Sequence, residues 1–313
     1  MKRTFHTLWV RVALLSLVVL AGCDRAAKKP RFIAGDDTLT SGTIHISADE
    51  SFQPVVDSQL KVFLSQNPDA NIIVHYKPEA DCLKDLADDS TRLVIVTRGL
   101  SEDEMLYYQD TLQFRPQFGS VASDAIAVIV NNASKDSLFS VSEIRGMLGG
   151  TVPTRYRQVM DGLTATSTVR FLLDSVLRGQ PFAKNVVAAR TSEGVIDYVA
   201  SNPDAIGYIG VSWIGNKEDS AQLTFMRKVR IAALQCGNCD QETYVKPYQA
   251  NIALKRYPLR RSLHYILKEN YPGLGKGFVN FLRHEKGQLI FKRAYLVPEW
   301  KSLEVRRVNL KEP

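Results

Sequence analysis

The sequence predicts an α/β protein of two lobes, and three observations carry that prediction. Ile44 and Ile46 alternate with polar neighbours, as in a strand with one buried face, and apolar residues then recur at helical spacing over 52–63. The continuously apolar runs 93–96 and 125–130 are typical of strands buried on both faces of a parallel sheet. Roughly 290 of the 313 residues follow an export signal, which is enough chain for two cores.

The chain begins with the features of that export signal. Basic residues precede the apolar run 12–20, which is too short to cross a bilayer comfortably. The sequence Leu-Ala-Gly-Cys, ending at Cys23, resembles a bacterial lipobox, in which the cysteine becomes the lipid-carrying N-terminus. We therefore expect a signal peptide over 1–22 and a mature protein that is exported and held on a bacterial membrane by lipid, including palmitate. An uncleaved membrane anchor is the alternative.

The net charge of the chain argues against a nucleic acid as its partner. The whole chain carries a net charge of +7, and three of its 40 basic residues lie in the expected signal peptide. The mature chain is therefore only mildly basic, which suits an anion-binding protein but not a nucleic-acid-binding one. Residues 23–41 are polar and lack periodicity, so we expect a flexible tether there.

The remaining cysteines are Cys82, Cys236 and Cys239. The last two flank Gly-Asn, a spacing found in metal sites, but no second Cys or His pair lies near them in sequence. In an oxidising compartment a disulfide across this turn is the favoured interpretation, with free thiols or a zinc site as alternatives. Cys82 is expected to be a buried small hydrophobic residue. We expect no metal site and no cofactor.

A polar loop, Ser-Ala-Asp-Glu-Ser over 47–51, joins the first predicted strand to the first predicted helix. Such a junction directs several backbone N–H groups and the positive end of a helix dipole at one point. This arrangement binds small anions without a charged side chain, so the loop is a candidate binding site. A simple helix N-cap is the alternative.

Thr97 and Arg98 follow the strand 93–96, at the end of the strand where ligands collect in open α/β sheets. Arg98 could donate two hydrogen bonds to an oxyanion, or it could form a salt bridge to Glu102 or Asp89. Just beyond, the spacing Ser-x-x-Glu at 101–104 predicts a capping box at the start of a helix.

Asp124 precedes another apolar strand, and its carboxylate could accept the proton of a ligand and reject an anion without one. Ordinary turn chemistry is the alternative. Hydroxyl groups crowd residues 164–168, and Thr166 or Ser167 is a natural N-cap for the helix that follows. That leaves spare hydroxyl and N–H groups for an anion. Arg170 could bind ligand or face solvent.

Seven stretches of the chain carry a resemblance to a known family: GTIHISADESFQPVV, RLVIVTRGLSEDE, SDAIAVIVN, TSTVRFLLDSVL, GVIDYVASNPDAIGYIGVSWI, VKPYQANIALKRYPLRRSLHYIL and GFVNFLRHEKGQLIFKRAYLVP. In this order they resemble the substrate-binding lipoproteins of phosphate ABC importers, within the type II periplasmic-binding-protein superfamily. The resemblance implies two α/β lobes joined by two crossover strands, with a ligand cleft that closes by a hinge motion. Lobe 1 would comprise 42–128 and a return segment 229–313, and lobe 2 would comprise 129–228.

The resemblance also implies a site and a function. Matching positions in the phosphate loops are Ser47, Ala48, Ser51, Thr97, Arg98, Asp124, Thr166, Ser167 and Thr168. The resemblance implies that the protein is a monomer. It also implies that the protein captures inorganic phosphate, or a similar tetrahedral oxyanion, for ABC permease and ATPase subunits.

Two departures from the family pattern stand out. Asp49 and Glu50 lie where Ser, Thr and Gly are usual, and the last loop lacks the usual Gly. Two carboxylates beside a dianion are costly unless they point away, cap the helix or are protonated. The alternative is therefore a sensory or protein-interaction lipoprotein that retains the fold without oxyanion transport.

Enzymatic activity is not expected. The chain contains no G-x-S-x-G, Walker A, G-x-G-x-x-G or H-E-x-x-H motif. Its five histidines fall in separate segments. A hydrolase acting on exported substrates would rest only on generic Ser and Asp residues.

Overall fold

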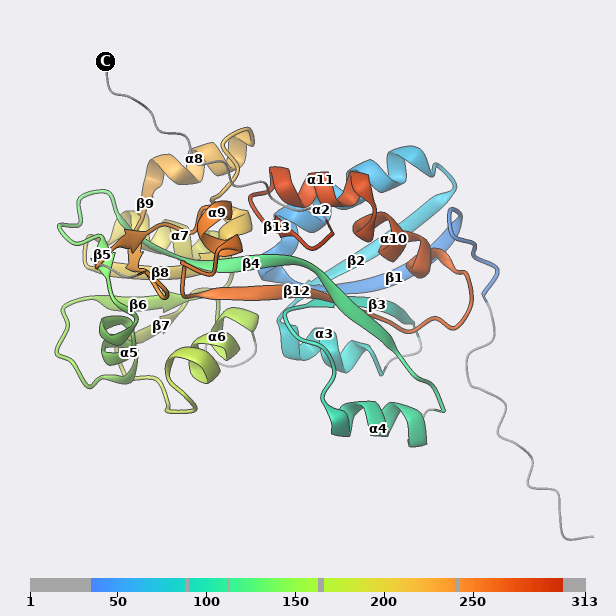
Figure 1. The fold of residues 1–313 in the computed structure, drawn as a ribbon, viewed down its shortest axis with the longest axis horizontal. Helices are drawn as coiled ribbons and strands as arrows, with labels where there is room; N and C mark the ends of the chain where they lie inside the picture. Colours follow the sequence, from blue (N-terminus) through green and yellow to red (C-terminus); the bar gives the residue numbers. More distant parts are fainter. Residues whose placement is uncertain (1–34, 88–89, 112, 163–165, 240–241, 301–313) are drawn as a thin grey trace, which may run out of the picture.

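The computed structural model describes residues 35–87, 90–111, 113–162, 166–239 and 242–300 (Figure 1). The expected signal peptide and the expected lipidation site at Cys23 lie outside these residues. Within the described ranges, no helix is both long enough and apolar enough to cross a membrane.

Lobe 1 begins with parallel strands that alternate with helices, as the sequence predicts. Strand β1 lies between β2 and β3 and is parallel to both. The elements are β1 (Gly42–Asp49), the short 3-10 helix η1 (Glu50–Phe52), α2 (Gln53–Gln66), β2 (Ala70–Lys77), α3 (Glu79–Asp85), β3 (Thr91–Val96) and α4 (Glu102–Thr111). The capping box at α4 is present, because the Ser101 N–H donates to Glu104 Oε2 and the Glu104 N–H donates to Ser101 Oγ.

The long strand β4 (Gln117–Asn131) crosses from one lobe to the other, and it is the central green ribbon of Figure 1. Its first part pairs with β12 (Arg260–Leu267) in lobe 1. Its last part pairs with β8 (Ala205–Gly210) and β9 (Val229–Ile231) in lobe 2. Asp124 therefore lies where the two lobes meet.

Lobe 2 repeats the parallel arrangement, with β6 between β7 and β8. Its elements are β5 (Leu138–Phe139), α5 (Val141–Gly149), β6 (Arg157–Met160), α6 (Ser167–Phe171), the one-turn π-helix η2 (Leu172–Val176), β7 (Val186–Ala188), α7 (Ser192–Ser201), β8, η3 (Val211–Trp213) and α8 (Ser220–Lys228). Apolar side chains of β4, β6, β8 and α7 form a buried cluster on one side of this sheet.

The return to lobe 1 comes late in the chain. Strand β9 pairs with β4 in lobe 2, and β10 (Ala233–Gln235) pairs with β5 and with β11 (Tyr244–Val245). After α9 (Gln249–Ala253), β12 joins β3 and β4. Helices α10 (Leu274–Arg283) and α11 (Glu285–Arg293) and strand β13 (Val297–Pro298) then complete lobe 1. We therefore propose that the crossing lies near Leu259 and not at residue 229, where the sequence placed it.

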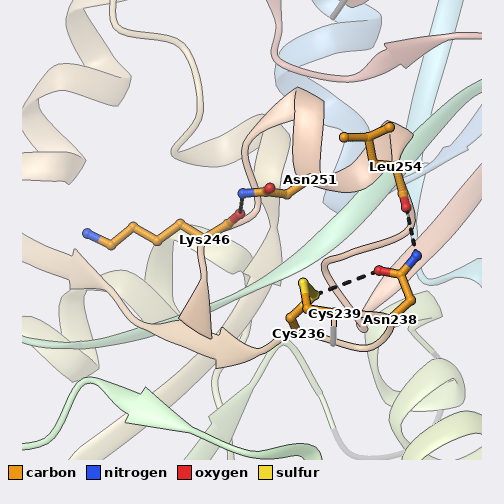
Figure 2. The surroundings of a disulfide bond; sticks show 6 residues. All are labelled: Cys236, Asn238, Cys239, Lys246, Asn251 and Leu254. Atoms are coloured by element: carbon orange, nitrogen blue, oxygen red, sulfur yellow. Dashed lines mark hydrogen bonds between the residues drawn. A yellow bond between two sulfur atoms is a disulfide. The ribbon is translucent and has the colours of Figure 1, made fainter. Parts of the chain in front are cut away.

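Cys236 and Cys239 form a disulfide across the turn after β10 (Figure 2). Asn238 lies within the turn, and its side-chain amide donates to the Leu254 carbonyl at 3.1 Å. The disulfide excludes a zinc site on these two thiols. Cys82 is buried, as expected from the sequence.

Residues 35–41, the described part of the expected tether, lie against lobe 1. The Asp37 carboxylate accepts hydrogen bonds from the Tyr271 hydroxyl at 2.8 Å and from the Leu274 N–H at 2.7 Å. These contacts attach the chain to the start of α10 before β1 begins.

Candidate ligand site between the lobes

Arg261 is the centre of a buried polar cluster between the lobes. Its side chain is 2% exposed and lies over the Phe52 ring, 4.8 Å from the ring centroid. Its Nε donates to Asp124 Oδ2 at 2.9 Å, because the two residues are cross-strand partners on β12 and β4. Its Nη2 donates to Ser51 Oγ at 3.1 Å, and its Nη1 donates to Ser167 Oγ at 2.9 Å. One guanidinium therefore contacts the crossing strand and both lobes.

Asp124 has spare hydrogen-bonding capacity. Its side chain is fully buried, and among the described residues its Oδ1 has no hydrogen-bond partner. Burial raises the pKa of this carboxyl, and the charge and hydrogen bond of Arg261 oppose that rise only in part. An unpaired buried acceptor is costly unless a ligand or water donates to it. The free oxygen can therefore accept an O–H group from a ligand.

Asp49 ends β1 and points into the same cluster. As the N-cap of η1, its carboxylate accepts the Ser51 N–H at 3.1 Å and also the Ser51 hydroxyl. From lobe 2 it accepts the Ser167 N–H at 3.2 Å and the Ser167 hydroxyl at 2.8 Å. Burial raises the pKa of Asp49, against the opposing charge of Arg261. Asp49 thus caps the helix, one of the arrangements expected for it, while facing the cluster.

Two further carboxylates lie beside this cluster. Glu50 accepts the Ser192 N–H at 3.0 Å and the Ser192 hydroxyl at 2.8 Å, which forms a second bridge from lobe 1 to lobe 2. Asp161 accepts the Thr166 hydroxyl at 3.0 Å. Burial, reinforced by the negative charges of Asp49 and Glu50, raises the pKa of Asp161 to about 7.

Glu79, Thr97 and Arg170 form a third connection between the lobes. Glu79 Oε1 accepts the Thr97 N–H at 2.7 Å and the Thr97 hydroxyl at 2.5 Å. Across the interface, Arg170 Nη2 donates to Thr97 Oγ1 at 2.6 Å and Arg170 Nε donates to Glu79 Oε2 at 2.5 Å. Arg170 therefore binds the other lobe and does not simply face solvent.

The structure brings together about half of the positions that the sequence singled out. Ser51, Asp124, Ser167 and Thr168 surround Arg261, with Thr168 Oγ1 3.5 Å from Arg261 Nη1. These four residues come from three segments that lie far apart in the sequence.

The remaining positions have other partners. Thr166 caps α6 through the Val169 N–H, and Thr97 belongs to the Glu79 network. Ser47 donates to Asp85, and Ala48 is a buried residue of β1. Arg98 forms a two-pronged ion pair with Glu104 at 2.7 and 2.8 Å, so it does not join the cluster. Arg98 therefore forms a salt bridge, as the alternative interpretation held, but with Glu104 and not with Glu102. The other expected partner, Asp89, lies outside the described residues.

Sequence reasoning missed Arg261. It lies among several basic residues over 255–261, and composition does not separate it from them. The pattern of β12 could have found it, because Arg261 alternates in register with the buried residues Leu263 and Tyr265. A charged residue at an inward position of a strand is expected to have a buried partner.

The cluster as a whole is rich in carboxylates. Among the described residues, only two arginines, Arg170 and Arg261, balance five carboxylates. The carboxylates are those of Asp49, Glu50, Glu79, Asp124 and Asp161. Even so, no group of three or more described His, Cys, Asp or Glu side chains is arranged to hold a metal ion.

Comparison with known proteins places the chain in a family. Residues 36–285 match the family model described as the PBP superfamily domain. The phosphate-binding protein PstS of Bacillus subtilis (strain 168) is 24% identical over 285 residues, which span 86% of this chain and 85% of that protein.

Solved structures share the fold. A putative phosphate ABC transporter substrate-binding protein from Clostridium perfringens, with bound phosphate, aligns with a TM-score of 0.68 and 20% identity over 82% of this chain and 99% of its own. An ABC-type phosphate transport receptor from Vibrio cholerae aligns with a TM-score of 0.60 and 18% identity over 82% and 100%. The CcmR regulatory domain of Synechocystis PCC6803, in complex with 2-PG, aligns with a TM-score of 0.53 and 10% identity over 78% and 96%. The chain therefore belongs to the PBP superfamily, and over most of its length it is similar to the phosphate-binding protein PstS.

Proposed function

We propose that this protein is an exported, lipid-anchored receptor that captures a tetrahedral oxyanion between its lobes and delivers it to an ABC importer. Phosphate is the first candidate ligand. The observation that carries the proposal is the pairing of Arg261 with an Asp124 carboxylate whose Oδ1 has no partner among the described residues. The homology to a phosphate-binding protein supports the same ligand class.

The chemistry of these groups suits an anion that keeps a proton. Arg261 supplies positive charge, and the hydroxyl and N–H groups of Ser51 and Ser167 supply donors from the two lobes. Asp124 supplies an acceptor, which a ligand O–H group can satisfy. Phosphate carries such a proton at neutral pH, whereas sulfate does not. A buried carboxylate therefore favours phosphate, because it repels an anion oxygen that has no proton to donate.

Calorimetric titration of the chain from Asp24 onward with phosphate and with sulfate tests this proposal. Asp124→Asn should reduce the preference for phosphate over sulfate by about tenfold or more, because the amide can donate to a sulfate oxygen. Asp174→Asn is the matched control, since Asp174 is exposed and should leave the preference unchanged. Absence of binding of both anions, in the native chain and in the Asp49 variants described below, would contradict the proposed function.

The anchoring has its own test. Cys23→Ser should move the protein from the membrane fraction to the soluble exported fraction, and an unchanged distribution would contradict lipidation at this cysteine.

A second candidate is a sensory or protein-interaction lipoprotein that retains the fold without oxyanion transport. The contacts of Asp49 favour it, because a carboxylate of the chain itself already holds donors from both lobes. Purified permease and ATPase subunits in vesicles distinguish the two candidates. Phosphate uptake that depends on this protein supports the receptor, and an absence of uptake favours the second candidate.

A further inference from the structure

The Asp49 carboxylate accepts donors that the proposed oxyanion would need. Its two oxygens accept the N–H and hydroxyl groups of Ser51, from lobe 1, and those of Ser167, from lobe 2. The two serine hydroxyls also lie 3.0 Å apart, and both contact Arg261. A carboxylate presents two oxygens and one negative charge, as does one edge of a tetrahedral oxyanion. Asp49 therefore has the contacts of a bound anion.

An oxyanion cannot use the same donors while Asp49 holds them. Each backbone N–H and each hydroxyl has a single hydrogen to donate, and Asp49 accepts all four. An anion beside an ionised Asp49 would also place like charges in contact within a buried site, which is costly. The anion and the carboxylate therefore exclude each other.

We propose that Asp49 is a built-in ligand: its carboxylate holds the two lobes closed without solute, and it must leave the Ser51 and Ser167 donors before an oxyanion binds them. This inference rests on the proposed function for its second part and stands on the lobe contacts alone for its first. It makes Asp49 the residue that sets the affinity of the site. A solute is retained only when its interactions exceed those that Asp49 already makes.

The first experiment compares phosphate binding by the native chain, Asp49→Ala and Glu50→Gln, using calorimetric titration. Asp49→Ala frees the four donors and should bind phosphate at least about tenfold more tightly than the native chain. Glu50→Gln is the matched control. It removes the neighbouring negative charge and alters a bridge between the lobes through Ser192, but it frees neither Ser51 nor Ser167. Its gain in affinity should be clearly smaller than that of Asp49→Ala, because the loss of a neighbouring charge leaves the four donors occupied.

Equal gains in the two variants would overturn the proposal, because the effect would then come from general negative charge. Equal affinities of the native chain and Asp49→Ala would also overturn it. Asp49→Asn keeps the shape of the side chain and serves if the alanine variant does not fold. Its amide oxygen is a weaker acceptor than a carboxylate, so it should show a smaller gain. Native affinity in Asp49→Asn would overturn the proposal.

The second experiment measures lobe closure without solute by small-angle X-ray scattering. The native chain should have the radius of gyration of the closed form, and Asp49→Ala should have a larger one that falls when phosphate is added. If no variant binds phosphate or sulfate, the proposed function fails. Scattering alone then decides the first part of the inference: a larger radius of gyration in Asp49→Ala supports it, and an unchanged one overturns it.

Discussion

Glu79 and Arg170 form an ion pair between the two lobes, with 2.5 Å separating Oε2 of the carboxylate from Nε of the guanidinium. The pair is asymmetric, since the Glu79 side chain is 2% exposed and the Arg170 side chain is 34% exposed. Burial alone would raise the pKa of Glu79, but the hydrogen bond and charge of Arg170, with the Thr97 donors, lower it. The buried Glu79 carboxylate therefore needs the ion pair to stay charged, whereas the Arg170 guanidinium is also stabilised by solvent.

Glu79→Gln should lower the free energy of unfolding by about 1–3 kcal/mol, because the interaction between the lobes loses its charge while Arg170 remains partly solvated. Asp174→Asn is the control, since Asp174 pairs with the same arginine at 3.4 Å but is exposed. Its effect should stay within about 0.5 kcal/mol. Urea denaturation measures both values, and equal losses in the two variants would contradict a special role for Glu79.

Gly277 on α10 leaves room for the segment that precedes β1. A Cβ at this position would lie 1.8 Å from the Leu39 carbonyl oxygen and 2.7 Å from its carbonyl carbon, and backbone atoms cannot move aside as a side chain tip can. Gly277→Ala should therefore destabilise the protein by about 1–3 kcal/mol and release residues 35–41 from lobe 1.

The control for Gly277 is Gly194→Ala on α7, where the nearest atoms would be 3.5 Å from the added carbon. That change should be neutral or stabilising by up to about 1 kcal/mol, because alanine favours the helix. Thermal unfolding compares the two variants, and faster hydrogen exchange at Leu274, whose N–H binds Asp37, reports release of the segment. Unchanged exchange in Gly277→Ala would contradict the expected detachment.

The disulfide between Cys236 and Cys239 predicts how many thiols of the denatured protein react before and after reduction. The denatured chain from Asp24 onward should show one reactive thiol, that of Cys82, before reduction and three afterwards. The closed loop is short, so Cys236→Ser with Cys239→Ser should cost no more than about 2 kcal/mol of stability. Three reactive thiols before reduction, in a chain from Asp24 onward that is secreted behind a cleavable signal peptide, would contradict the disulfide.

The sequence predicted the elements of the fold well because its local patterns agree with the tertiary structure. The strand over Ile44 and Ile46, the helix that follows and the apolar strands 93–96 and 125–130 all form. The capping box at Ser101 forms as well. In each case a short window of residues decides the conformation, so no knowledge of distant contacts was needed.

The candidate site was less predictable because its pairing is non-local. Arg261 meets Ser51 across 210 positions of sequence, and only the register of β12 against β4 brings it to Asp124. Arg98, which looked suited to an oxyanion, finds a partner six positions away on its own loop and helix. The nearby carboxylate of Glu104 determines the orientation of the Arg98 side chain, although Arg98 follows the end of a strand.

Asp161 should give the protein a distinctive dependence of stability on pH. Burial, with the charges of Asp49 and Glu50, raises its pKa in the folded state to about 7, from an ordinary value of 3.8. Between these values the folded protein keeps the proton and the unfolded chain loses it. The contribution of Asp161 to stability is therefore largest below about pH 4, falls as the pH rises, and levels off above about pH 7.

Asp161→Asn removes this titration. The free energy of unfolding of the native chain, relative to the variant, should fall by up to about 4 kcal/mol between pH 4 and pH 7, since three pKa units correspond to that amount. Both proteins retain Asp49 and Glu50, so the slopes from those groups cancel in the difference, apart from the part that comes from their repulsion by Asp161. Asp103→Asn, at an exposed position on α4, serves as the control and should give a flat difference. Denaturation curves at several pH values provide the measurement, and parallel profiles for the native chain and Asp161→Asn would show that Asp161 is ionised throughout the range.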